Sequence, residues 1–201
     1  IMTLDFSPDI HSKKRATAAM LGTSGSGKTS LVNEWAIKAL NRQRPVLIVD
    51  LQSQFEHLGP EVSVQPDFES LVNGEFADEL MLSEWRGLLV LDDCDAYLDG
   101  KGKIPAPWSR LFSSNRHFRI DIVSNARRVQ ETPKMLLSAA RYLAIFQCHD
   151  DLSLERISRE IHNVKGAIEA IPTKPHEYLL IDRQSRTFSR HKTMRLPPEA
   201  E

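Results

Sequence analysis

Gly22-Thr23-Ser24-Gly25-Ser26-Gly27-Lys28-Thr29 is the stretch of this 201-residue chain that decides the fold. It fits G-x-x-x-x-G-K-[ST], the pattern of the phosphate-binding loop of nucleoside triphosphatases. Before it, the apolar run 17–21 predicts a short buried strand, and after it residues 28–41 show helical periodicity. The sequence therefore places the loop between a strand and a helix, which is the context that the pattern requires.

The composition of this loop suits an anion. Its glycines let the backbone curl so that successive N–H groups point inward, and the helix N-terminus adds partial positive charge. Lys28 can reach the β- and γ-phosphates, and the Thr29 hydroxyl can hold Mg²⁺. The residues predicted to bind the triphosphate are Gly22, Thr23, Ser24, Gly25, Ser26, Gly27, Lys28, Thr29 and Ser30.

The composition limits the classes of function. Basic residues (26) and acidic residues (27) nearly cancel, so any contact with nucleic acid has to come from local patches or from an assembled ring. Cys94 and Cys148 match no metal-binding spacing and indicate reduced thiols. No apolar run reaches the roughly 18 residues of a transmembrane helix, and no signal-peptide pattern occurs. We therefore expect no membrane span and a cytoplasmic location.

Short apolar runs alternate with helical patterns along the chain, which predicts an α/β fold of three layers with a mostly parallel central sheet. We expect a single domain over residues 1–201, with its core at about 15–190 and a C-terminal β-hairpin. The predicted strands are 17–21, 46–50, 88–92, 120–124 and 142–147, with hairpin strands 178–182 and 186–190. The predicted helices are 28–41, 76–85, 107–113, 133–140 and 152–163.

Two acids follow the apolar run 87–91, as in the Walker B motif. Mg²⁺ prefers hard oxygen ligands, so we expect Asp92 to bind the metal, directly or through water. Hydrolysis needs a group that polarises the attacking water, and Asp93 is the candidate. Both acids stand at the C-terminal end of a predicted parallel strand, where ligands bind in open α/β sheets.

Polar residues also end the next predicted strand. Asn125 or Ser124 could contact the γ-phosphate or the lytic water, although Ser-Asn is also favoured in plain turns. Phosphoryl transfer gains from an extra cation, often supplied by a neighbouring subunit, and Arg127 and Arg128 are candidates. The alternative for each is a solvated or carboxylate-paired arginine. Further candidates are Arg141, Arg156 and Arg159.

The order of these motifs resembles the FtsK–HerA superfamily of DNA-pumping ATPases, across roughly residues 17–190. The stretches that carry the resemblance are 45–50 followed by Gln54-Phe55, the paired acids, 124–134, 140–146 and 150–157. The resemblance implies ATP and Mg²⁺ as cofactors, a homo-oligomeric ring, usually a hexamer, with double-stranded DNA through its centre, and a trans-acting arginine. Compact members include viral genome-packaging ATPases, which implies docking at a capsid or portal vertex, in the host cytoplasm or on the virion.

The chain departs from the superfamily pattern at three positions. The superfamily pattern has a Glu before the Phe at this turn, whereas this chain has Gln54 before Phe55. The second Walker B acid is Asp93 rather than the commoner Glu. The Asn125-Ala126 pair replaces a Gln. A shorter acid has to lie closer to the water that it polarises, and the residue that senses the γ-phosphate can be Ser124 or Asn125.

Two basic groups are candidates for contact with DNA. Lys101 and Lys103 flank a glycine in the loop after Walker B, and Arg116 and Arg119 flank His117-Phe118. Such groups grip backbone phosphates without reading sequence, although the loop could equally be a solvated surface. A third run, 13–15, has the same ambiguity.

The motifs favour an ATP-hydrolysing DNA motor, most simply a genome-packaging ATPase. A nucleotide or small-molecule kinase is the first alternative, but it would need an arginine-rich lid where the sequence predicts a fourth strand. An ATP-dependent assembly or secretion protein without DNA translocation is the second.

Overall fold

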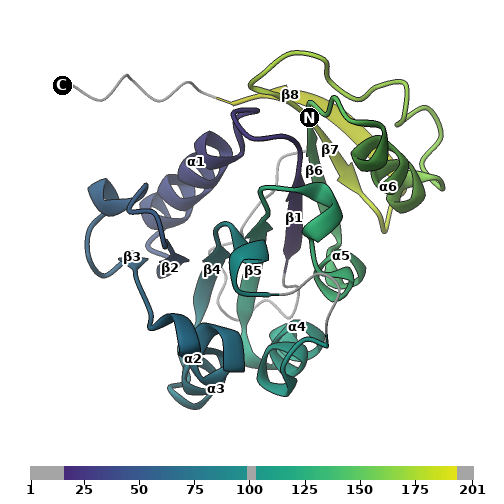
Figure 1. Ribbon diagram of the computed structural model, residues 1–201. Coiled ribbons are helices and arrows are strands. Elements are labelled where there is room, and N and C mark those ends of the chain that lie inside the picture. The colour runs from purple at the N-terminus through teal and green to yellow at the C-terminus, as the bar shows by residue number, and fades with distance from the viewer. Residues whose placement is uncertain (1–15, 99–102, 194–201) are drawn as a thin grey trace.

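The computed structural model describes residues 16–98 and 103–193. Its described residues form an eight-stranded sheet with the order β3-β2-β4-β5-β1-β6-β7-β8 (Figure 1). Neighbours in the series β3-β2-β4-β5-β1-β6 pair in parallel. The pairs β6–β7 and β7–β8 are antiparallel. The predicted α/β class and C-terminal hairpin are confirmed. The strands are β1 Thr17–Leu21, β2 Val46–Val49, β3 Ser63–Val64, β4 Gly87–Leu91, β5 Ile120–Asn125, β6 Tyr142–Phe146, β7 Glu177–Asp182 and β8 Thr187–Lys192.

Helices cover both faces of the sheet. On β1, Ala18 and Met20 pack in one core cluster with Leu31 and other residues of α1. Ala19, the residue between them, packs with Ile157 of α6 in a cluster on the opposite face. Because successive side chains of a strand point to opposite faces, this alternation makes three layers. The helices are α1 Lys28–Asn41, α2 Phe68–Asn73, α3 Glu75–Leu82, α4 Ala106–Phe118, α5 Lys134–Ala139 and α6 Asp151–Ile161.

The central strands are buried on both faces. Every residue of β1, β4 and β5 is buried, as expected for parallel strands covered by helices. The strand order puts β5 between β1 and β4, and the register pairs Met20 with Asn125 and Leu91 with Ser124. The phosphate-binding loop after β1 and the acids after β4 therefore lie on either side of the end of β5.

The structure differs from the sequence prediction at three elements. β3 and α2 were not predicted, because a two-residue strand and a six-residue helix are too short to show a period. α4 continues past its predicted end at residue 113 and kinks at Ser114, which has φ −122°. Among the described residues, no helix has the length and apolar character to cross a membrane.

Candidate functional site

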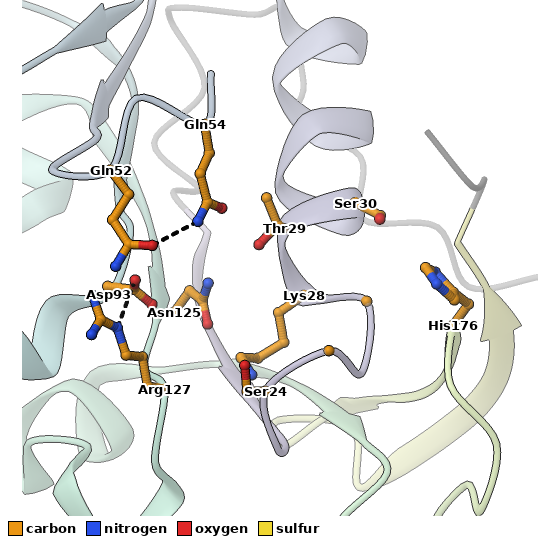
Figure 2. Close-up of a pocket in the computed structure, with 12 residues that line it drawn as sticks. Ser24, Lys28, Thr29, Ser30, Gln52, Gln54, Asp93, Asn125, Arg127 and His176 are labelled. Atoms are coloured by element: carbon orange, nitrogen blue, oxygen red, sulfur yellow. Dashed lines mark hydrogen bonds and ion pairs between the residues drawn. The ribbon is translucent and has the colours of Figure 1, made fainter. Parts of the chain in front are cut away.

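A pocket of about 520 Å³ lies at the C-terminal ends of the parallel strands (Figure 2). Its floor is the loop between β1 and α1. Other walls come from the segments that follow β2, β4 and β5, and from the residue that precedes β7. The lining residues are Ser24, Gly25, Gly27, Lys28, Thr29, Ser30, Gln52, Gln54, Asp93, Asn125, Arg127 and His176.

The loop is shaped to receive an anion. Gly27 has φ 106°, which few other residues adopt, and a Cβ there would lie 3.0 Å from the Nδ1 atom of His176. Gly27 is also the N-cap of α1, and no described side chain caps the first turn of that helix. The first N–H groups of α1 are therefore available to phosphate oxygens, and they carry the positive end of the helix dipole.

Lys28 is folded onto the loop. Its Nζ donates to the carbonyl oxygens of Gly22 (2.8 Å) and Thr23 (2.9 Å). Burial lowers the pKa of Lys28, and the charge of Asp93 is the main opposing influence. A phosphate would offer the ammonium group charged acceptors in place of neutral ones, so this geometry suits a triphosphate.

Asp92 is a buried acid with one strong partner. Its side chain is 2% exposed, and the Nδ2 atom of Asn125 donates to its Oδ1 at 2.7 Å. Burial raises the pKa of Asp92 from 3.8 to about 7; the charge of Asp93 adds to the shift and the Asn125 hydrogen bond opposes it. A divalent cation would offset the cost of ionising this carboxylate. The carboxylate and the Thr29 hydroxyl are hard oxygen ligands of the kind that Mg²⁺ prefers.

Asp93 is paired with a neighbouring arginine. Its backbone is left-handed (φ 45°), a conformation that is uncommon outside glycine and concentrates at functional sites. Its Oδ2 accepts a hydrogen bond from the Nε of Arg127 at 2.8 Å, and the backbone N–H of Arg127 donates to Asp95 at 3.0 Å. The hydrogen bond to Asp93 raises the pKa of Arg127. The guanidinium is half exposed at the mouth of the pocket, where it faces both Asp93 and solvent.

The structure separates the two candidates at the end of β5. Asn125 lines the pocket, whereas the Oγ of Ser124 lies 3.5 Å from the carbonyl oxygen of Ala18, within the sheet. The Oδ1 of Asn125 is buried and has no hydrogen-bond partner among the described residues. Of the two residues, Asn125 is the one placed to contact a ligand.

Arg128 does not line the main pocket. Its side chain is 72% exposed and forms an ion pair with Glu131 at 3.0 Å. Together with Gly22, Thr23 and Arg127, it lines a second hollow of about 310 Å³. Arg128 therefore faces outward from the chain rather than towards the acids.

Two of the other candidate arginines are committed to the fold. Arg141 forms a bidentate ion pair with Asp182, with N–O distances of 3.2 and 2.7 Å. Arg156 donates to the carbonyl oxygens of Gln130 and Thr132 and so holds the segment after β5 against α6. Arg159 is exposed and lies 3.8 Å from Glu155 on the same helix.

Of the basic residues considered for DNA, Arg116 and Arg119 lie away from the pocket. Lys101 falls outside the described residues, and Lys103 is exposed just before α4. Arg116 is in the last turn of α4 and Arg119 is its C-cap, directly before the first residue of β5. They therefore lie at the start of β5, whereas Asn125 and the pocket lie at its end, and their role in DNA binding stays a prediction.

Two pocket residues were not foreseen. Gln52 follows β2, and the Nε2 of Gln54 donates to its Oε1 at 2.8 Å. Their turn is built by the buried Asp50, which accepts hydrogen bonds from the backbone N–H groups of Gln54 (3.0 Å) and Phe55 (2.7 Å). The rule that strand ends line the site could have indicated Gln52.

His176 is the other pocket residue that was not predicted, and no motif or strand-end position in the sequence indicates it. It lies about 150 residues after the loop, and only the position of β7 in the sheet brings it to the pocket.

The sheet order and the loop between β1 and α1 are those of an α/β domain with the P-loop fold. No protein-family model matches the chain, and no curated protein sequence matches it significantly. Solved structures do match it in fold.

One is the genome packaging NTPase B204 from Sulfolobus turreted icosahedral virus 2 in complex with ATP-gammaS, with a TM-score of 0.76 at 19% identity, covering 94% of this chain and 99% of that one. The DNA-packaging ATPase B204 from Sulfolobus turreted icosahedral virus gives a TM-score of 0.73 at 20% identity, with 89% and 97% covered. The cytoplasmic domain of the Thermomonospora curvata type VII secretion ATPase EccC gives 0.68 at 12% identity, over 94% of this chain and 26% of that one. The expected resemblance to FtsK–HerA ATPases is confirmed at the level of the fold.

Proposed function

We propose that this protein is an ATP-hydrolysing motor that moves double-stranded DNA, as a viral genome-packaging ATPase does. The carrying observation is that Lys28, Asp93 and Asn125 line one pocket and that Asn125 donates a hydrogen bond to the buried Asp92. The fold around that pocket is similar, over nearly the whole length of both chains, to the genome packaging NTPase B204 from Sulfolobus turreted icosahedral virus 2.

Each residue has a role that its geometry supports. The N–H groups of the loop and the Lys28 ammonium hold the β- and γ-phosphates. The Thr29 hydroxyl and the Asp92 carboxylate would hold Mg²⁺, which would neutralise charge on the phosphates. Asp93 orients and polarises the attacking water, while Asn125 fixes the Asp92 carboxylate through its 2.7 Å hydrogen bond.

The arginines fit two different tasks. Arg127 is held beside Asp93 within the same subunit, where its charge can act on the phosphate end of the pocket. Arg128 points outward, so it fits better as the cation that one subunit offers to its neighbour. This assignment requires a ring, which we propose to be a hexamer with ATP at the subunit interfaces.

The net charge of the chain is only −1, so the protein as a whole does not attract DNA. Local basic groups therefore have to make the contact. Lys103 near the N-terminus of α4, and Arg116 with Arg119 at its other end, are the proposed contacts along the channel. They would bind backbone phosphates, so the interaction should be independent of sequence and weaken steeply with salt.

The ATPase rate with and without duplex DNA, measured for the native protein and for Lys28→Ala, tests the proposal. We expect DNA of any sequence to stimulate hydrolysis, and Lys28→Ala to abolish it with the fold intact, because among the described residues the ammonium donates only to carbonyl oxygens of the loop. Lys38→Ala is the matched control, since Lys38 is an exposed lysine on the same helix. Substantial activity in Lys28→Ala would refute the site assignment.

Two further measurements separate the alternatives. Transfer of the γ-phosphate to a nucleoside or sugar would identify a kinase instead of a motor. A monomer in light scattering, even with ATP and duplex DNA present, would contradict the ring and the role of Arg128. Hydrolysis that DNA leaves unchanged would favour an assembly or secretion ATPase.

A further inference from the structure

His176 lies on the far side of the phosphate-binding loop from the acids. Figure 2 shows it beyond the start of α1, whereas Asp93 and Arg127 lie at the opposite side of the pocket. It comes from the turn that leads into β7, while the acids follow β4. The loop after β1 lies between these two groups, because β1 separates β4 and β5 from β6 and β7 in the sheet.

The direction of a bound triphosphate follows from this arrangement. The γ-phosphate has to be near Asp92 and Asp93, where the metal and the attacking water are held. The β-phosphate lies over the loop, so the rest of the nucleotide leaves the pocket on the side away from the acids. That side is the one that His176 occupies.

The imidazole of His176 is held in place before any ligand arrives. Its backbone N–H donates to the carbonyl oxygen of Ser26 at 2.8 Å, and its carbonyl oxygen accepts from the N–H of Thr193 at 2.8 Å. Its Nδ1 lies 3.1 Å from the Thr193 hydroxyl. The backbone is left-handed (φ 63°), which is uncommon outside glycine. The hairpin strands β7 and β8 thus position an aromatic ring directly against the loop.

The ring is also available to a ligand. His176 is half-buried and lines the pocket, and its Nε2 has no hydrogen-bond partner among the described residues. The absence of a side chain at Gly27 allows this close approach. We propose that His176 is the platform for the nucleobase, so that the C-terminal hairpin supplies base recognition while the loop supplies phosphate recognition. This inference rests on the proposed nucleotide-binding function.

Because every base has an aromatic face, a stacking platform is tolerant of base identity. The ring should therefore strengthen binding of ATP and GTP alike, by about tenfold, and contribute nothing to inorganic tripolyphosphate. That contrast distinguishes a base contact from general support of the loop.

The test is calorimetric titration of the full chain with ATPγS and with tripolyphosphate, both in the presence of Mg²⁺. The key variant is His176→Asn, because asparagine tolerates left-handed backbone but has no aromatic ring. We expect it to bind ATPγS about tenfold more weakly and to bind tripolyphosphate as the native protein does. His176→Phe keeps a ring and should retain the affinity for ATPγS. His162→Asn, an exposed histidine at the end of α6, is the control.

Three results would overturn the inference. His176→Asn could bind ATPγS normally, or it could lose affinity for both ligands equally, which would make His176 a support of the loop. His176→Phe could lose ATPγS while keeping tripolyphosphate, which would exclude stacking. A native protein that binds neither ligand would instead refute the nucleotide site itself, and the inference with it.

Discussion

Asp92 offers a prediction whose size can be worked out from the structure. Its pKa is raised from 3.8 to about 7, mainly by burial and then by the charge of Asp93. Between these two values the folded protein binds more protons at this carboxyl than the unfolded chain does, so stability falls as the pH rises. At 1.36 kcal/mol per pKa unit, ionised Asp92 costs the ligand-free protein about 4 kcal/mol above pH 7.

Asp92→Asn removes that charge and keeps an oxygen for the hydrogen bond from Asn125. Without Mg²⁺ or nucleotide, we expect the variant to be more stable than the native protein, by a margin that grows by about 3 kcal/mol between pH 5 and pH 8. The same variant should lose hydrolysis, because it lacks the carboxylate for the metal. Stability gained at the expense of activity is what a strained catalytic site predicts.

Urea unfolding followed by circular dichroism at the two pH values measures this margin, provided that the m-value stays constant. Asp151→Asn is the control, since Asp151 is an exposed carboxyl on α6, and it should change stability by less than about 0.5 kcal/mol at either pH. A margin that does not change with pH, or a variant less stable than the native protein at pH 8, would show that burial does not penalise the Asp92 charge as argued.

Three further substitutions test other parts of the structure. Asn125→Ala removes the hydrogen bond that lowers the pKa of Asp92, so the rise of kcat/KM with pH should move to higher pH in a pH–rate profile. Asp121→Asn removes the charged member of the buried ion pair with Arg44 and should cost about 3–5 kcal/mol in urea unfolding. Arg127→Ala should change stability by less than about 1 kcal/mol, because its ion pair is half exposed, yet lower kcat at least about tenfold; an unchanged kcat would exclude it from the site.

Much of the fold was predictable because its signals are local. The loop was identified by residue spacing alone, and the predicted strand 17–21 and helix 28–41 agree with β1 and α1 as the structure has them. The buried parallel strands show as short apolar runs, which do not depend on what packs against them. Elements without such a run, such as β3, could not be predicted.

Much of the candidate site was not predictable, because it depends on how side chains from distant segments are oriented. Sequence placed Ser124 and Asn125 equally at a strand end, and only the pairing with β1 and the direction of each side chain bring Asn125 to Asp92. The ion pair between Asp93 and Arg127 likewise joins segments after two different strands.

The sequence by itself predicted a phosphate-binding loop in an α/β fold with acids at the end of another strand, because backbone curvature and strand burial are local properties. The tertiary structure decided which polar side chains face that pocket and brought His176 of the C-terminal hairpin to the loop. The physical reason is that strand order and register fix such contacts, and neither is encoded in the spacing of residues along one segment.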